Sequence, residues 1–168
     1  MDPAGFKGLR TRYKLEPGDL ESILDLHIEV YEREHGYNSG FGDYVKRTLD
    51  EFRREHTKRE KVWIIEEGGD LVGCLAVVER SDNTAQLRWF LVHPFYRGKG
   101  LGTRMFKEAM EFIKDKEYKK AYLTTQNILE DAAGIYRDQG FELVWEGEEE
   151  RTWGVPSREQ RYERKIRT

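Results

Sequence analysis

Residues 87–106, LRWFLVHPFYRGKGLGTRMF, run from an apolar segment through a basic, glycine-rich loop into a helical repeat. The loop, RGKGLG at residues 97–102, holds three glycines and two basic residues. A strand followed by a glycine loop and a helix places free backbone N–H groups at the positive end of a helix dipole. The stretch therefore predicts a binding site for a phosphate-bearing ligand.

Two common phosphate-binding motifs do not fit this loop. In a P-loop the lysine is followed by Ser or Thr, but Lys99 is followed by Gly100. The dinucleotide fingerprint GxGxxG fails as well, because Thr103 or Met105 occupies the third glycine position in the two registers. A glycine-rich turn without a ligand is the remaining alternative, although a turn alone does not require three glycines beside two basic residues.

The composition predicts one folded domain over residues 1–168. Charged residues make up 36% of the chain, but 12% of the residues are aromatic, which is more than a disordered acidic chain carries. The 29 basic and 32 acidic residues give a net charge of −3, so no extended nucleic-acid surface is expected.

The single cysteine, Cys74, excludes an internal disulfide and lies in an apolar run, where a buried, inert thiol is expected rather than a nucleophile. The first ten residues, MDPAGFKGLR, lack the apolar stretch of a signal peptide, and no run of 18 apolar residues exists. We therefore expect a soluble, cytoplasmic protein with no membrane partner.

Hydrophobic periodicity and turn residues give the order of the elements. Strands are expected at residues 9–15, 62–67, 71–80, 84–92, 121–125, 141–145 and 161–166. Helices are expected at residues 19–36, 41–52, 102–113 and 130–139, with Asp19 as the N-cap of the first and His27 on its apolar face. Residues 62–92 read as an antiparallel meander, and residues 84–125 as a right-handed βαβ unit.

The remaining loop pattern, Arg97-x-x-Gly100-x-Gly102, resembles the acetyl-CoA pyrophosphate motif of the GNAT N-acetyltransferases, (Gln/Arg)-x-x-Gly-x-(Gly/Ala). The Val-His-Pro before it and the segment AAGIYRDQGF (residues 132–141) after it are similar to other motifs of that family. The resemblance implies an α/β (α+β) fold. It is a single domain with a central, mixed, mostly antiparallel sheet of about seven strands, flanked by about four helices.

Three shorter segments resemble one branch of the family, the acetyltransferase domains often fused to MarR-type transcriptional regulators. They are EHGY at residues 34–37, the Trp63-Ile64 strand, and the Tyr-Arg-x-x-Gly-Phe pattern that begins at Tyr136.

The resemblance implies a residue set for acetyl-CoA. Backbone groups of Leu91 and Val92 would pair with the pantetheine arm, and either Gln126 or Asn127 would meet it from the next strand. The pyrophosphate would lie on the backbone N–H groups of Arg97, Gly98, Lys99, Gly100, Leu101, Gly102 and Thr103. No metal ion is implied.

The implied chemistry is direct attack of an amine on the thioester. A lysine-like ammonium titrates near ~10.4, so a group must accept its proton, and a backbone N–H such as that of Val92 must bind the oxyanion. Tyr136 matches the family's general acid for the departing thiolate, with ring packing alone as the alternative. Glu34 and His35 are the candidate bases.

Further possible bases are His27, Glu79 and His93, and a water relay without a dedicated residue is the alternative to all of them. Trp153, in the long loop at residues 146–157, is expected either to line the acceptor pocket or to pack the loop.

Two functions follow from the resemblance. The first is transfer of an acetyl group from acetyl-CoA to a primary amine of an unidentified small molecule or protein. The second is a catalytically idle module that binds acyl-CoA or a partner. A homodimer through the C-terminal strands is consistent with the family, although no residue pattern fixes it.

Overall fold

The structure is a computed structural model, and it describes residues 8–54 and 57–167. Residues 1–7, most of the N-terminal segment for which no signal peptide is predicted, lie outside the described residues. None of the helices formed by the described residues combines the length and the apolar character needed to span a bilayer.

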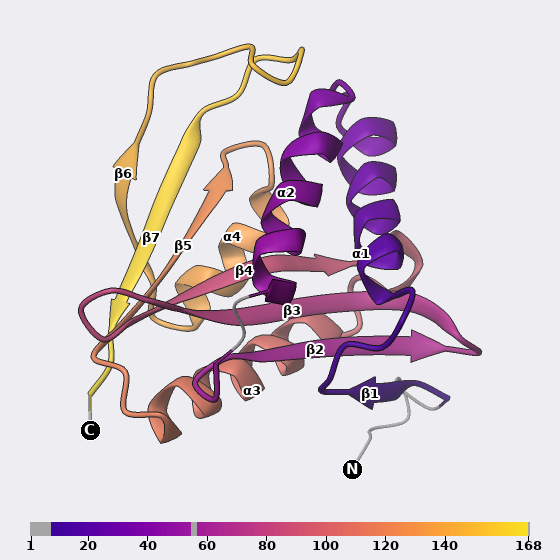
Figure 1. The fold of residues 1–168 in the computed structure, drawn as a ribbon. Helices are drawn as coiled ribbons and strands as arrows, with labels where there is room; N and C mark the ends of the chain where they lie inside the picture. Colours follow the sequence, from indigo (N-terminus) through magenta and orange to yellow (C-terminus); the bar gives the residue numbers. More distant parts are fainter. Residues whose placement is uncertain (1–7, 55–56, 168) are drawn as a thin grey trace.

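The chain forms a seven-stranded sheet with four α-helices among the described residues (Figure 1). The strands are β1 (Arg10–Arg12), β2 (Lys61–Glu67), β3 (Asp70–Arg80), β4 (Thr84–Val92), β5 (Lys120–Gln126), β6 (Glu142–Glu146) and β7 (Glu159–Lys165). The helices are α1 (Asp19–Ile28), α2 (Gly40–Arg54), α3 (Leu101–Asp115) and α4 (Glu130–Asp138), with a π-helix η2 (Glu29–Glu34) and a 3₁₀ turn η3 (Pro94–Tyr96). The predicted fold class and element order are confirmed.

The sheet order is β1-β2-β3-β4-β5-β7-β6. The meander β2-β3-β4 is antiparallel as predicted, and β4 and β5 form the parallel pair of the predicted βαβ unit. The last strand, β7, is inserted between β5 and β6, and pairs antiparallel with both. The sheet therefore consists of a β1–β4 half and a β5-β7-β6 half, joined only where β4 meets β5.

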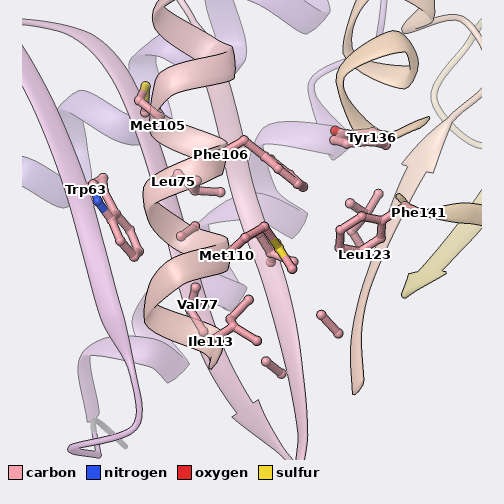
Figure 2. Close-up of a cluster of buried hydrophobic side chains, with 14 of the residues drawn as sticks. Trp63, Leu75, Val77, Met105, Phe106, Met110, Ile113, Leu123, Tyr136 and Phe141 are labelled. Carbon is pink, nitrogen blue, oxygen red and sulfur yellow. The ribbon is translucent and has the colours of Figure 1, made fainter. Parts of the chain in front are cut away.

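Helices cover both faces of the sheet. Helices α1 and α2 pack on one face through residues such as Ile23 and Leu49, while α3 and α4 pack on the other (Figure 1). Figure 2 shows Phe106 of α3 beside Tyr136 of α4 in this second core, with their ring centroids 5.6 Å apart. Because both faces are covered, β3 is buried from Val72 to Val78, including the Cys74 thiol.

The first helix differs from the prediction in two ways. Gly18, with φ 91°, is its N-cap, whereas Asp19 is the first helical residue. The Asp19 carboxylate accepts hydrogen bonds from the Arg12 guanidinium and from the Glu16 N–H instead, so the ion pair with β1 outcompetes capping. The predicted single helix to Gly36 is also interrupted, because its second half is the π-helix η2.

Candidate functional site

The site lies where β4 and β5 separate. Their parallel pairing begins at Thr84 with Lys120 and ends at Gln86 with Tyr122, after which the strands diverge (Figure 1). A cavity of about 1000 Å³ occupies the gap and is lined by residues of both strands. The second half of β4 thus presents an edge with no strand partner on this side.

The antiparallel ladder between β3 and β4 decides which backbone groups face this gap. The His93 N–H donates to Val72 O at 2.8 Å, so this pair is hydrogen-bonded. Because hydrogen-bonded and non-hydrogen-bonded pairs alternate, Val92 directs its own N–H and C=O away from β3 and toward the gap. Its carbonyl accepts a hydrogen bond from Arg97 Nε at 3.1 Å, which leaves the N–H for a ligand.

A β-bulge lies in the middle of β4. The register with β3 shifts between Cys74 and Ala76, and Trp89 adopts a left-handed conformation with φ 51°, which is strained for a tryptophan. Two bonds hold it there: Trp89 Nε1 donates to Thr48 Oγ1 at 2.9 Å, and Cys74 Sγ donates to the Trp89 carbonyl at 3.0 Å. The bulge bends β4 at the point where it leaves β5.

The glycine loop leads directly into α3 at the end of the gap. Gly98 and Gly100 have φ values of 77° and 85°, a region that strains other residues, and Gly100 is the N-cap of α3. The first intrahelical bond runs from the Arg104 N–H to Gly100 O, so the three preceding amides have no intrahelical acceptor. No acidic side chain lies in this first turn, which leaves its positive potential for an anion.

Gly102 lets α3 approach the sheet closely. A Cβ at this position would lie 3.2 Å from Phe90 Cζ of β4 and 3.3 Å from Ile135 Cδ1 of α4, which is tighter than ordinary packing. The first two glycines therefore shape the loop, whereas the last one lets the helix pack closely on the sheet.

Glu34 and His35, at the end of η2, line the same cavity. Glu34 Oε1 accepts a hydrogen bond from Arg97 Nη1 at 2.6 Å and lies 3.4 Å from His35 Nε2. This ion pair joins the glycine loop to the connection between η2 and α2. The Glu34 carboxylate is therefore held by the Arg97 guanidinium in this structure.

Tyr136 of α4 lines the cavity and is 5% exposed. Burial raises its pKa well above the ordinary value, and a hydrogen-bonding contact with Thr125 partly offsets the rise. The phenol is consequently protonated at neutral pH and available as a proton donor. Its ring also packs on Phe90 and Phe106, so ring packing and cavity lining coexist in this residue.

Most of the residues expected to meet acetyl-CoA line this cavity. They are Leu91, Val92, Arg97, Gly98, Gly100, Leu101, Gly102, Thr103, Gln126 and Tyr136. Lys99 and Asn127 are not among the lining residues. The Asn127 side chain accepts a hydrogen bond from the Arg158 N–H at 2.7 Å, which holds it against the start of β7 and leaves Gln126 facing the cavity.

The other candidate bases differ in position. His27 lines the cavity and is fully buried, and its Nδ1 donates to Ile23 O at 2.8 Å, so Nε2 carries the lone pair. Burial lowers the His27 pKa to about 4 and keeps the ring neutral. Glu79 is bound by Arg59 on another part of the surface, and His93 is absent from the cavity wall.

Burial raises the pKa of the Cys74 thiol to about 12, in keeping with an inert thiol.

Several lining residues escaped the sequence analysis. Tyr31 comes from η2, and its ring lies 4.2 Å from that of Phe41 of α2. Tyr44 of α2 and Arg88 of β4 also line the cavity. Trp153, for which the sequence left pocket lining and loop packing open, does both, because it lines the cavity and packs on Phe41. The apolar periodicity of the α2 segment predicts that Phe41 is a core residue, but it does not predict that Phe41 lines a cavity. Arg88 carried no signal, because the tertiary packing decides which face of β4 lines the cavity.

A model of the acetyltransferase (GNAT) family matches residues 20–141, which span the first helix, the split strands, the glycine loop and α4. The chain belongs to this family. The general reaction of GNAT proteins is acetyl-CoA-dependent N-acetylation. The resemblance inferred from the glycine loop is thereby confirmed at the level of the family.

Similar relatives of this GNAT chain include the uncharacterized N-acetyltransferase YjgM of Escherichia coli, 30% identical over 85 residues. That match covers 49% of this chain and 51% of YjgM, so the chain spans about half the length of this relative. The spermidine N(1)-acetyltransferase of Escherichia coli is 27% identical over 136 residues, covering 80% of this chain and 72% of that protein.

Two solved structures show the same fold. An acetyltransferase from Streptococcus agalactiae superposes with a TM-score of 0.73 at 23% identity, over 96% of this chain and 100% of the other. The spermidine N-acetyltransferase from Vibrio cholerae, in complex with CoA and spermine, has a TM-score of 0.66 at 22% identity, over 94% and 95% of the two chains.

Proposed function

We propose that this protein transfers the acetyl group of acetyl-CoA to a primary amine by direct attack. One observation carries the proposal: the unpaired edge of β4 ends beside the N-terminus of a helix, α3, that has no acidic residue in its first turn. An extended arm with amides suits the strand edge, and a pyrophosphate suits the helix end. Acetyl-CoA carries both groups in this order.

The chemistry at the thioester is assigned to two groups. The free Val92 N–H faces the gap and would donate to the oxyanion of the tetrahedral intermediate. Tyr136 would donate its proton to the departing thiolate. Its raised pKa makes it a weak acid, but the same buried setting also raises the proton affinity of the thiolate, so the transfer remains feasible.

For the proton of the amine we propose Glu34, with His35 beside it. Arg97 holds the Glu34 carboxylate, and a pyrophosphate at the glycine loop would compete for the same guanidinium. Binding of the donor would then release a carboxylate at the cavity wall. His27, neutral and with a free Nε2 lone pair, is the second candidate for this role.

The acceptor is a small amine in this proposal. Glu148, Glu150 and Glu159 line the cavity from the β6–β7 side and attract an ammonium group. Polyamines are one class to test, because the Escherichia coli relative is named as a spermidine acetyltransferase.

The test uses the purified full chain with acetyl-CoA and a panel of primary amines, and it follows the release of free CoA. Calorimetric titration with acetyl-CoA reports donor binding separately. Turnover on at least one amine, at a rate above hydrolysis, is the expected result. Tight acetyl-CoA binding with no turnover on any amine would instead favour the idle acyl-CoA-binding module.

A further inference from the structure

Arg88 is a cation of the cavity wall without an anionic partner. Its Nη2 donates to the Tyr44 hydroxyl at 3.4 Å, and its guanidinium carbon lies 5.3 Å from the centre of the Trp89 ring. Among the described residues, none forms an ion pair with it. The other cavity arginine, Arg97, is by contrast neutralised by Glu34.

The regular alternation of side chains in the first half of β4 places Arg88 on the α2 side of the sheet. In a regular strand, neighbouring side chains alternate between the two faces of the sheet. Arg88 lies opposite Ala76 of the α1–α2 core and therefore faces α2, where it reaches Tyr44. The extra residue of the bulge brings Trp89 to the same side, where it reaches Thr48. The bulge therefore places Trp89 beside Arg88 on the same side of β4, next to the cavity.

The surroundings of Arg88 do not offset its charge. His27 packs nearby, and burial together with the positive charge of Arg88 keeps this ring neutral. Glu148, Glu150 and Glu159 line the cavity, but none of them forms an ion pair with Arg88 among the described residues. A partly buried guanidinium with most of its donors unused has the geometry that a carboxylate fills with paired hydrogen bonds.

Building on the proposed function, we propose that the acceptor amine also carries a carboxylate, which binds Arg88. The rest of this subsite is aromatic: Trp153 lies 5.2 Å from Phe41 and 5.7 Å from Tyr44 between ring centroids. The acceptor class is thus an amino acid or a related amine with an apolar body. A polyamine is disfavoured, because it would bring further positive charge to Arg88.

The position of Arg88 also bears on the length of the acceptor. Arg88 precedes Val92 by four residues, which is about 13 Å along an extended strand. The arginine side chain and the bulge shorten the span that the acceptor itself must cover. The test therefore includes one acceptor with a short and one with a long separation between the amine and the carboxylate.

The test compares matched amines with and without a carboxylate: 6-aminohexanoate against hexylamine, and phenylalanine against 2-phenylethylamine. We expect the wild-type kcat/KM to favour the carboxylate member of at least one pair by about tenfold or more. Arg88→Gln should lower kcat/KM for that member by about 10- to 100-fold and change the other member less than about threefold.

Three further arms complete this comparison. Arg88→Lys should retain part of the preference, and Arg47→Gln, which removes an exposed charge from α2, should leave it unchanged. With spermidine, Arg88→Gln should raise kcat/KM. Equal rates within both pairs, or an equal loss for both members in Arg88→Gln, would overturn the proposal, because the latter marks a structural role.

A binding measurement separates this inference from the proposed function. N-acetylphenylalanine and N-(2-phenylethyl)acetamide are titrated into the CoA-saturated protein and its Arg88→Gln variant. Carboxylate-dependent binding that disappears in the variant supports the anion site even if no amine is turned over. Turnover of amines without any carboxylate preference would overturn the anion site and leave the proposed function intact.

Discussion

At Tyr136, removal of the phenol oxygen separates the packing role of the ring from its proposed role as a proton donor. Tyr136→Phe keeps the ring contacts with Phe90 and Phe106 but removes the proton donor. We expect kcat to fall by about 10²- to 10³-fold while acetyl-CoA affinity changes less than about threefold. Steady-state kinetics and calorimetry measure the two quantities.

Tyr122→Phe is the matched control for this change, since Tyr122 lies on β5 under Arg161 and outside the cavity wall. Unchanged turnover in Tyr136→Phe would remove Tyr136 from the acid role.

Glu34 can be tested in the same way. Glu34→Gln retains an oxygen for Arg97 but cannot take up a proton, so we expect kcat at neutral pH to fall by about 10- to 100-fold. Glu32→Gln, on the same π-helix but outside the cavity wall, should have no such effect. A full rate in Glu34→Gln together with a loss in His27→Gln would move the base to His27.

His27 also links stability to pH. Its pKa is about 4 in the folded state and about 6.5 in an unfolded chain, so the unfolded state binds more protons between these values. The contribution of His27 to stability is therefore complete above pH 6.5 and is lost as the pH falls toward 4. We expect it to shrink by about 2 kcal/mol between pH 7 and pH 5.

Urea unfolding gives the free energy of unfolding of the wild type and of His27→Gln at both pH values. The change with pH in the wild type minus the change with pH in the variant isolates the contribution of His27. His93→Gln, a histidine near the surface, serves as the reference. An identical pH dependence in wild type and His27→Gln would show that His27 is not the titrating group.

At the scale of the element, a negative charge at the start of α3 would oppose the proposed binding of the pyrophosphate. Gly100→Glu places a carboxylate at the N-cap, where the pyrophosphate is proposed to bind, and at φ 85° it also strains the backbone. We expect acetyl-CoA affinity to fall by more than about 100-fold. Calorimetric titration gives the value.

Gly100→Gln has the same shape and the same strain without the charge. It should therefore lose less affinity than Gly100→Glu, and thermal melting of both variants controls for folding. Equal affinities in the two variants would show that electrostatics at the helix end do not hold the donor.

At the scale of the whole molecule, Asn38 joins the α-helical layer to the long loop between β6 and β7. Its side chain donates to Thr152 O at 3.2 Å and accepts from the Gly40 N–H at 3.0 Å, while its backbone N–H donates to Trp153 O at 2.7 Å. The loop that carries Trp153 is thereby tied to the side of the cavity where the acceptor is proposed to bind.

Asn38→Ala should consequently raise the KM for the acceptor several-fold without changing acetyl-CoA affinity, and it should lower the free energy of unfolding by about 1–2 kcal/mol. Hydrogen exchange at residues 148–156 should increase as well. Ser39→Ala is the control. A loop that exchanges as slowly in Asn38→Ala as in the wild type would contradict this role.

The local parts of the site could be predicted from the sequence. Gly98 and Gly100 adopt positive φ angles as a glycine-rich turn requires, and the helix begins directly after them, because both features depend on residues that are neighbours along the chain. The order of strands and helices followed from hydrophobic periodicity for the same reason. The family resemblance rested on these local signals.

The tertiary structure decided the rest, because it depends on contacts between distant residues. The insertion of β7 beside β5, the divergence of β4 from β5 after Gln86, and the ion pair between Arg97 and Glu34 have no local signature. The bulge at Trp89 is likewise held by bonds to Thr48 and Cys74, and it places Trp89 beside Arg88. The sequence by itself thus determined the site of the proposed donor, whereas the residues facing the acceptor were decided by the packing of β4 against α2.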